Sequence, residues 1–107
     1  MAKAREWAKE LVLELGEHGI RVDAVTLFGS YARGDFSSSS DLDLVIVSSD
    51  WEGVNYTERL SLLYRLWDKD IDANSVALTP RELRDRLRKS IVLRGASKYW
   101  IVLYEED

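Results

Sequence analysis

The chain has 107 residues, of which 46% are hydrophobic and 32% charged, and its formal net charge is -4. This composition is typical of a soluble globular protein and excludes a disordered or fibrous chain. The sequence contains no cysteine, which excludes disulfides and thiolate metal sites, so a metal ion would need oxygen ligands or the one histidine, His18. The acidic balance argues against broad nucleic-acid binding, which needs many cations to neutralise phosphates.

We expect one domain over residues 1–107, because a chain of this length can bury one core but has no room for a second domain that recognises a large substrate. No apolar run approaches the roughly 20 residues that cross a bilayer. Residues 1–10 carry interspersed charges in place of a signal-peptide core. We therefore expect a cytoplasmic protein without a membrane segment.

The first predicted elements are a helix, a strand, a loop and a second strand. Apolar residues recur at helical spacing over 4–15 and predict an amphipathic helix. The apolar, β-branched run over 21–28 predicts a buried strand. Residues 29–40 are rich in glycine and serine, which predicts a loop, and the alternating segment 41–47 predicts the next strand.

The rest of the chain predicts helix, strand, helix and strand. Apolar residues at helical spacing predict a helix over 56–68, and an apolar run predicts a strand over 71–78. A capping box over 79–82 predicts the start of another helix, and residues 99–104 predict the last strand. This order predicts an α/β (α+β) fold, a small mixed sheet of about four strands covered by about three helices. The apolar faces expected are Leu60, Leu63, Tyr64 and Trp67 in the first of these helices and Leu83, Leu87 and Ile91 in the second.

The chemistry is concentrated in the loop and the strand that follows it. A glycine directly after a buried strand, Gly29, lets backbone amides approach a ligand closely, and Ser30 adds a hydroxyl donor. Gly34 is placed to end a single helical turn. Asp41 and Asp43 share one face of their strand because side chains alternate. The segment therefore predicts a phosphate cradle beside a carboxylate pair.

Two carboxylates on one face repel each other unless a cation lies between them, and Mg²⁺ takes one or two carboxylates together with substrate phosphates. With a third carboxylate, two ions could stabilise both the attacking and the leaving oxygen of an in-line displacement. Asp72 is the expected third ligand, since alternation turns it toward the catalytic face. Asp70 would face the same way and is the alternative.

At this point the sequence resembles a known family. Gly29 and Ser30, ten intervening residues and then Asp41-Leu42-Asp43 are similar to the signature of the polymerase-beta-like nucleotidyltransferase superfamily. The fuller Gly-Ser-Tyr-Ala-Arg-Gly with Ser-Asp-Leu-Asp-Leu resembles its minimal nucleotidyltransferase branch, often paired in prokaryotes with HEPN-domain proteins as toxin-antitoxin systems. The resemblance covers nearly the whole chain and implies a nucleotidyltransferase fold.

The resemblance also implies roles for individual residues. Gly29 and Ser30 would hold the nucleotide phosphates, Asp41 and Asp43 would bind two Mg²⁺ ions, and Asp72 would bind the ion that activates the attacking hydroxyl. The reaction would transfer a nucleoside monophosphate, AMP if ATP is the substrate, with release of pyrophosphate. The acceptor in paired systems can be a tyrosine of the HEPN partner. The alternative from another class is an antitoxin that neutralises a HEPN partner by occlusion, with little or no catalysis.

Several residues keep two interpretations. Arg33 is either a phosphate contact or an exposed loop charge, and Ser40 is expected to belong to the nucleotide-binding loop and to cap or orient the region around Asp41. His18 follows the first helix and is interpreted as a helix-end residue, not a base. Trp51 lies in a polar stretch and is expected to be exposed and to favour an interface or a homo-oligomer. The basic residues between 81 and 89 are interpreted as a solvated helix face, with an acidic partner or nucleic acid as the alternative.

Overall fold

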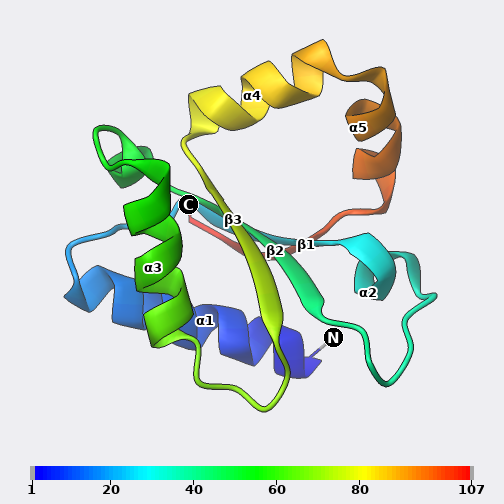
Figure 1. Cartoon of the computed structure of the whole chain (residues 1–107), viewed down its shortest axis with the longest axis horizontal. Coiled ribbons are helices and arrows are strands. Elements are labelled where there is room, and N and C mark those ends of the chain that lie inside the picture. Colours follow the sequence, from blue (N-terminus) through cyan, green and yellow to red (C-terminus); the bar gives the residue numbers. More distant parts are fainter. Residues whose placement is uncertain (1, 107) are drawn as a thin grey trace.

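Within residues 2–106, four strands form one mixed sheet in the order β3-β2-β1-β4 (Figure 1). The computed structural model describes residues 2–106. β1 pairs antiparallel with both β2 and β4, whereas β2 and β3 run parallel, so the first residues of β2 and β3 meet at one end of the sheet. The strands are β1 (Ala24–Phe28), β2 (Leu42–Val47), β3 (Ala73–Leu78) and β4 (Ile101–Glu105).

The predicted α/β fold with a four-stranded mixed sheet is confirmed, but residues 2–106 form five α-helices beside the sheet where about three were expected. A five-residue helix lies inside the predicted loop, and the last predicted helix divides at Ser90, whose side chain caps the second part. None of the helices over residues 2–106 combines the length and apolarity that a membrane span requires. The helices are α1 (Ala2–Glu17), α2 (Gly29–Arg33), α3 (Tyr56–Leu66), α4 (Pro80–Lys89) and α5 (Ile91–Ala96), with 3-10 turns η1 (Ser49–Trp51) and η2 (Ser97–Tyr99).

The main core lies between one face of the sheet and helices α1 and α3. Alternate strand residues point to this face, and they are almost completely buried against α1 residues such as Leu11 and Leu15. Trp7 of α1 and Trp67 after α3 pack edge to face with ring centroids 6.1 Å apart, at the border of this core. The buried strand residues of the main core are Val25, Leu27, Leu42, Leu44, Ile46, Ala77 and Leu103.

The opposite face carries a smaller apolar cluster under α4 and α5. Val45, Val47 and Leu78 form its buried part, and Leu83 of α4 packs against them. In Figure 1, α4 and α5 lie on the side of the sheet opposite to α1 and α3. Because side chains alternate along β2, Asp43 belongs to this second face together with Val45 and Val47.

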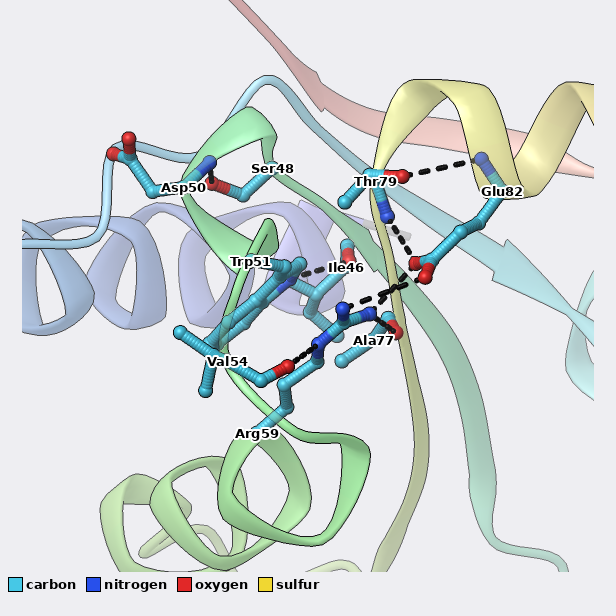
Figure 2. Close-up of polar contacts among 9 residues, drawn as sticks. All are labelled: Ile46, Ser48, Asp50, Trp51, Val54, Arg59, Ala77, Thr79 and Glu82. Carbon is cyan, nitrogen blue, oxygen red and sulfur yellow. Dashed lines mark hydrogen bonds and ion pairs between the residues drawn. The ribbon is translucent and has the colours of Figure 1, made fainter.

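A buried arginine of α3 links the carboxyl end of β3 to α4 (Figure 2). Arg59 of α3 donates from Nε to the Val54 carbonyl (2.9 Å) and from Nη1 to the Ala77 carbonyl (3.0 Å), and it forms an ion pair with Glu82 (2.6 Å). Glu82 also completes the predicted capping box with Thr79, the N-cap of α4. The Arg59 guanidinium, followed by the Thr79 backbone N–H, lowers the pKa of the Glu82 carboxyl below its usual value.

Three expectations about apolar residues are wrong. Trp51 is fully buried, because η1 folds the polar stretch back and lets its indole N–H donate to the Ile46 carbonyl (3.1 Å). Tyr64 lies off the buried face of α3 and is 87% exposed. Ile91 is 79% exposed, because α4 ends at Lys89 and the change of direction at Ser90 turns it away from the sheet.

Candidate functional site

Two carboxylates and one amide meet where β2 and β3 begin. Asp43 lies in β2 and Asp41 just before it, and the parallel register pairs Asp43 with Asn74 of β3. The Asn74 side-chain nitrogen donates to Asp41 Oδ2 and to Asp43 Oδ1, each at 3.3 Å. The two carboxylates are half-buried and the amide is exposed, so a ligand can reach all three.

The turn after β1 lies directly against Asp43, because the register pairs Asp43 with Phe28, the residue before the turn. Gly29 has φ +72, and a Cβ added there would lie 2.8 Å from Cγ of Asp43 and would collide with its Oδ2. Any larger residue would therefore be strained in its backbone and would displace the carboxylate. Glycine at this position lets the backbone turn approach the Asp43 carboxylate closely.

Helix α2 opens at that turn as a single short helical segment. Its N-cap, Phe28, contributes no side-chain cap, which leaves the first backbone N–H groups of α2 without a side-chain acceptor. Gly34 ends the helix with φ 86, and its N–H donates to the Ser30 carbonyl (2.9 Å). The predicted helical turn capped by Gly34 is confirmed.

The other candidate phosphate contacts occupy different positions. Arg33 at the end of α2 is half-exposed, forms an ion pair with Asp35 (3.3 Å) and lines the cavity described below. The Ser40 hydroxyl accepts from the Ser37 N–H (2.9 Å) and thereby closes the serine turn that leads to Asp41. Ser30 is half-buried beside Gly29. Arg33 and Ser30 therefore lie at the glycine turn, whereas the Ser40 side chain organises the loop.

The expected third carboxylate does not lie in β3. Asp72 immediately precedes β3 with an exposed side chain, its carbonyl accepts the Leu42 N–H (2.9 Å), and it shares a cavity wall with Asp41 and Asn74. Asp70, the alternative, is exposed in the same loop. Over residues 2–106, no three or more His, Cys, Asp or Glu side chains are grouped in a way that could hold a metal ion. The metal-binding role of Asp72 stays a prediction.

The donor set that does converge fits one Mg²⁺ ion bound together with a nucleotide. Asp41 and Asp43 supply carboxylate oxygens, and Asn74 carries an amide oxygen beside its nitrogen. Mg²⁺ in proteins is commonly held by one or two carboxylates while substrate phosphates and water complete its octahedron. Because the Asp43 carboxylate lies against the Gly29 turn, an ion bound to it would be close to the backbone that would hold the phosphates.

A largely apolar cavity of about 550 Å³ lies between the second face of the sheet and helices α4 and α5. Its walls include Phe28 and Trp100, whose ring centroids are 6.0 Å apart, and its edge includes Gly29 and Arg33. The size falls within the range of small-molecule sites. The cavity therefore continues the glycine turn on the same face as Asp43.

Sequence reasoning missed the cavity and Asn74. The alternation that points Asp72 toward the catalytic face points Asn74 to the same face, which is the signal that could have identified it. The cavity depends on how α4 and α5 are held above the sheet, and no local pattern encodes that distance.

Comparisons with known proteins agree with this fold. A family model described as a nucleotidyltransferase domain matches residues 6–99. A crystal structure of a provisionally named nucleotidyltransferase from Sulfolobus solfataricus superimposes with a TM-score of 0.68 at 24% identity, over 98% of this chain and 83% of that one. A toxin-antitoxin structure with AMP-PNP superimposes with a TM-score of 0.51 at 24% identity, over 91% and 73% of the two chains.

A short match links the chain to a provisionally named protein adenylyltransferase of Methanocaldococcus jannaschii. The identity is 56% over 27 residues, which are 25% of this chain and 27% of the relative. Because the family model covers most of the sequence, the chain belongs to the nucleotidyltransferase domain family. This membership agrees with the Gly-Ser and Asp-x-Asp motifs, while the chain spans only about a quarter of the length of the curated relative it matches.

Proposed function

We propose that this nucleotidyltransferase transfers a nucleoside monophosphate, AMP from ATP, to a hydroxyl group of a protein in the cytoplasm. The observation that carries the proposal is the contact of the Asp43 carboxylate with the Gly29 turn, with Asp41 and Asn74 beside it. This contact supports the proposal, because carboxylate oxygens of the kind that Mg²⁺ prefers lie next to a backbone turn that can receive phosphates. The family membership of residues 6–99 supports the same chemistry.

Each residue then has a defined task. Gly29 and Ser30 hold the nucleotide phosphates, and Arg33 contributes positive charge at the same turn. Asp41 and Asp43 bind the Mg²⁺ that accompanies the nucleotide, and Asp72 is the proposed ligand of a second ion. Bound Mg²⁺ supplies charge neutralisation at the phosphates and at the attacking oxygen. Positioning and electrostatics account for catalysis, because the protein forms no covalent bond in this scheme.

The transfer itself is a displacement at the α-phosphorus. The acceptor oxygen forms a bond to the α-phosphorus while the bond between that phosphorus and the oxygen leading to the β-phosphorus breaks. Pyrophosphate leaves with the electron pair of the broken bond, and the hydroxyl proton passes to water at the open end of the sheet. The half-buried setting of Asp41 and Asp43 leaves room for both acceptor and water.

The apolar cavity is the proposed site of the nucleoside. It begins at Gly29 and Arg33, where the phosphates would lie, and it extends under α5 toward Phe28 and Trp100. An aromatic wall favours stacking of a planar base. A triphosphate on the turn with its base in the cavity would leave the α-phosphate near the carboxylates.

A tyrosine of a HEPN-type partner is the proposed acceptor. The name of the Methanocaldococcus relative supports a protein as the acceptor, and the toxin-antitoxin assembly with AMP-PNP supports both a partner protein and an adenine nucleotide. The resemblance to minimal nucleotidyltransferases supports the HEPN class in particular. The partner would supply the acceptor side of the site.

The second candidate, occlusion of the partner with little catalysis, is favoured by one observation. The residues of the site bring together two carboxylates and an amide, and no third acidic side chain joins them among residues 2–106. A site with weaker metal binding would transfer slowly and still bind a partner. Mass spectrometry after incubation with the HEPN-type partner and ATP distinguishes transfer from occlusion, because occlusion gives a complex without added nucleotidyl mass.

The proposed activity is tested by transfer of label from α-labelled ATP to the partner. Asp41→Asn and Asp43→Asn should each reduce transfer about 100-fold or more, because each removes a metal-ligating charge. Asp85→Asn is the matched control, since its carboxylate forms an exposed ion pair with Arg88 on α4, away from the site. Undiminished labelling by both site variants would overturn the assignment.

A further inference from the structure

Asn74 occupies the position in β3 that lies beside both carboxylates. The parallel register sets Asn74 opposite Asp43, and the residue two positions earlier, Asp72, lies outside the strand. The Asn74 nitrogen reaches Asp41 and Asp43 at equal distances of 3.3 Å. The neighbour of the carboxylate pair in the sheet is therefore a neutral amide and not a third acid.

A side-chain amide suits this position in the metal-free protein. Its NH₂ group carries two donors, which is enough to serve one oxygen of each carboxylate. Two like charges held close together destabilise a fold, and hydrogen bonds to the charged oxygens offset part of that repulsion. A carboxylate at the same position would instead add a third negative charge to the cluster.

The amide also limits how strongly the site holds a free ion. The affinity of an oxygen site for a divalent cation rises with the number of ligand charges. With Asn74 in place, the converging ligands contribute two charges, and a nucleotide must bring the rest. Asn74 can still offer its amide oxygen to an ion once the side chain rotates.

We propose that Asn74 is a positioning residue that holds Asp41 and Asp43 together without metal and makes strong Mg²⁺ binding dependent on the nucleotide. This inference rests on the proposed function, in which the carboxylate pair binds the metal. It assigns the residue a task beyond that function, namely control of when the ion binds. The ion would enter with the triphosphate and would not reside in the protein between turnovers.

The test compares Asn74→Asp with the native chain in the absence of nucleotide. Binding of Mn²⁺, followed by electron paramagnetic resonance, should be about tenfold tighter in Asn74→Asp, because a third charge joins the ligands. The metal-free variant should unfold a few degrees below the native chain, and millimolar Mg²⁺ should restore its midpoint. The native midpoint should barely respond to Mg²⁺ until ATP is added.

Two further variants separate this role from general effects of charge and packing. Asn55→Asp makes the same substitution at the N-cap of α3, where a carboxylate can still accept from the Glu58 N–H. Because Asn55 does not contact Asp41 or Asp43, the Mn²⁺ affinity of this variant should equal that of the native chain. Asn74→Ala removes the donor without adding charge. It should lower the metal-free midpoint but leave Mn²⁺ binding no tighter than in the native chain.

In the transfer assay, the Mg²⁺ concentration for half-maximal labelling should fall about tenfold in Asn74→Asp, in line with the tighter binding of the free ion. Equal Mn²⁺ affinities and equal metal-free midpoints for Asn74→Asp and the native chain would overturn the inference. The metal-binding and unfolding measurements contain no nucleotide, so they test the proposed role of Asn74 even if the chain has no transferase activity. Conversely, normal labelling with unaltered metal binding in Asn74→Asp would defeat this inference alone and leave the proposed function intact.

Discussion

The two ends of the β2–β3 pair are built in opposite ways. At the carboxyl ends, Arg59 is buried and donates to two carbonyls and to Glu82, and the buried Trp51 lies beside it (Figure 2). At the amino ends, Asp41 and Asp43 are open to solvent and share one amide. The difference indicates that buried polar contacts fix the fold at one end of the strand pair, whereas the other end leaves two carboxylates within reach of solvent.

The comparison is tested most strongly at the glycine turn. In Gly29→Ala, the added Cβ collides with the Asp43 carboxylate, so transfer of label from α-labelled ATP should fall about 100-fold, the usual cost of misplacing a reacting group by about 1 Å. Gly34→Ala is the matched control, because its φ is also positive but nothing lies within 4 Å of the added Cβ. It should lose some stability and keep most of its transfer activity. Equal transfer losses in both variants would mean that backbone strain, not displacement of Asp43, is responsible.

At the other end of the strand pair, Arg59→Met should act on stability. The substitution removes charged hydrogen bonds from the Val54 and Ala77 carbonyls and leaves Glu82 without its partner, which should cost about 2 kcal/mol in the free energy of unfolding. Chemical denaturation followed by circular dichroism measures the loss. Arg65→Met on the exposed side of α3 should change little. A native-like midpoint for Arg59→Met would contradict the idea that this end fixes the fold.

The apolar cavity extends along the second face of the sheet from Gly29 to Leu78. Filling it should weaken nucleotide binding without unfolding the chain. In Leu93→Trp the larger ring enters the cavity from α5 and should raise the dissociation constant of ATP about tenfold, or about 1.4 kcal/mol. Val92→Trp places the same ring on the exposed side of α5 and should bind ATP normally. Calorimetry with tripolyphosphate, which has no nucleoside, should give equal affinities for both variants. If Leu93→Trp weakens both ligands alike, the nucleoside does not bind in this cavity.

The sequence predicted those features of the fold and of the candidate site that depend on local patterns. Helical and strand periodicity predicted the strands and most helices, and a glycine before a hydroxyl residue with a later Asp-x-Asp predicted the turn and the carboxylate pair. These features depend on residues that are close in the chain or that alternate along one strand. They need no knowledge of how strands pair.

The missed features depend on contacts between distant segments. Asn74 lies beside Asp43 because of the parallel register of β3 and β2, which brings together two residues that are 31 positions apart in the chain. Trp51 is buried because η1 folds it under Ile46, although its sequence neighbours are polar. Ile91 is exposed because the chain bends at Ser90, and a helical pattern that runs across a bend gives no sign of it.

The smallest expected effect is the pH dependence of the stability that the Arg59–Glu82 ion pair provides. Because the folded chain lowers the pKa of Glu82, the pair stabilises the fold above the ordinary carboxyl pKa, and this stability is lost as the pH falls through the lowered value. Glu82→Gln keeps the capping geometry but not the charge. The difference in unfolding free energy between the native chain and this variant should therefore be larger at pH 7 than at pH 3. Since the Glu82 side chain is 43% exposed, we expect a change of only about 0.5 kcal/mol. A difference that grows toward acid pH would contradict the sign of the shift and the view that Arg59 holds Glu82 in its charged form.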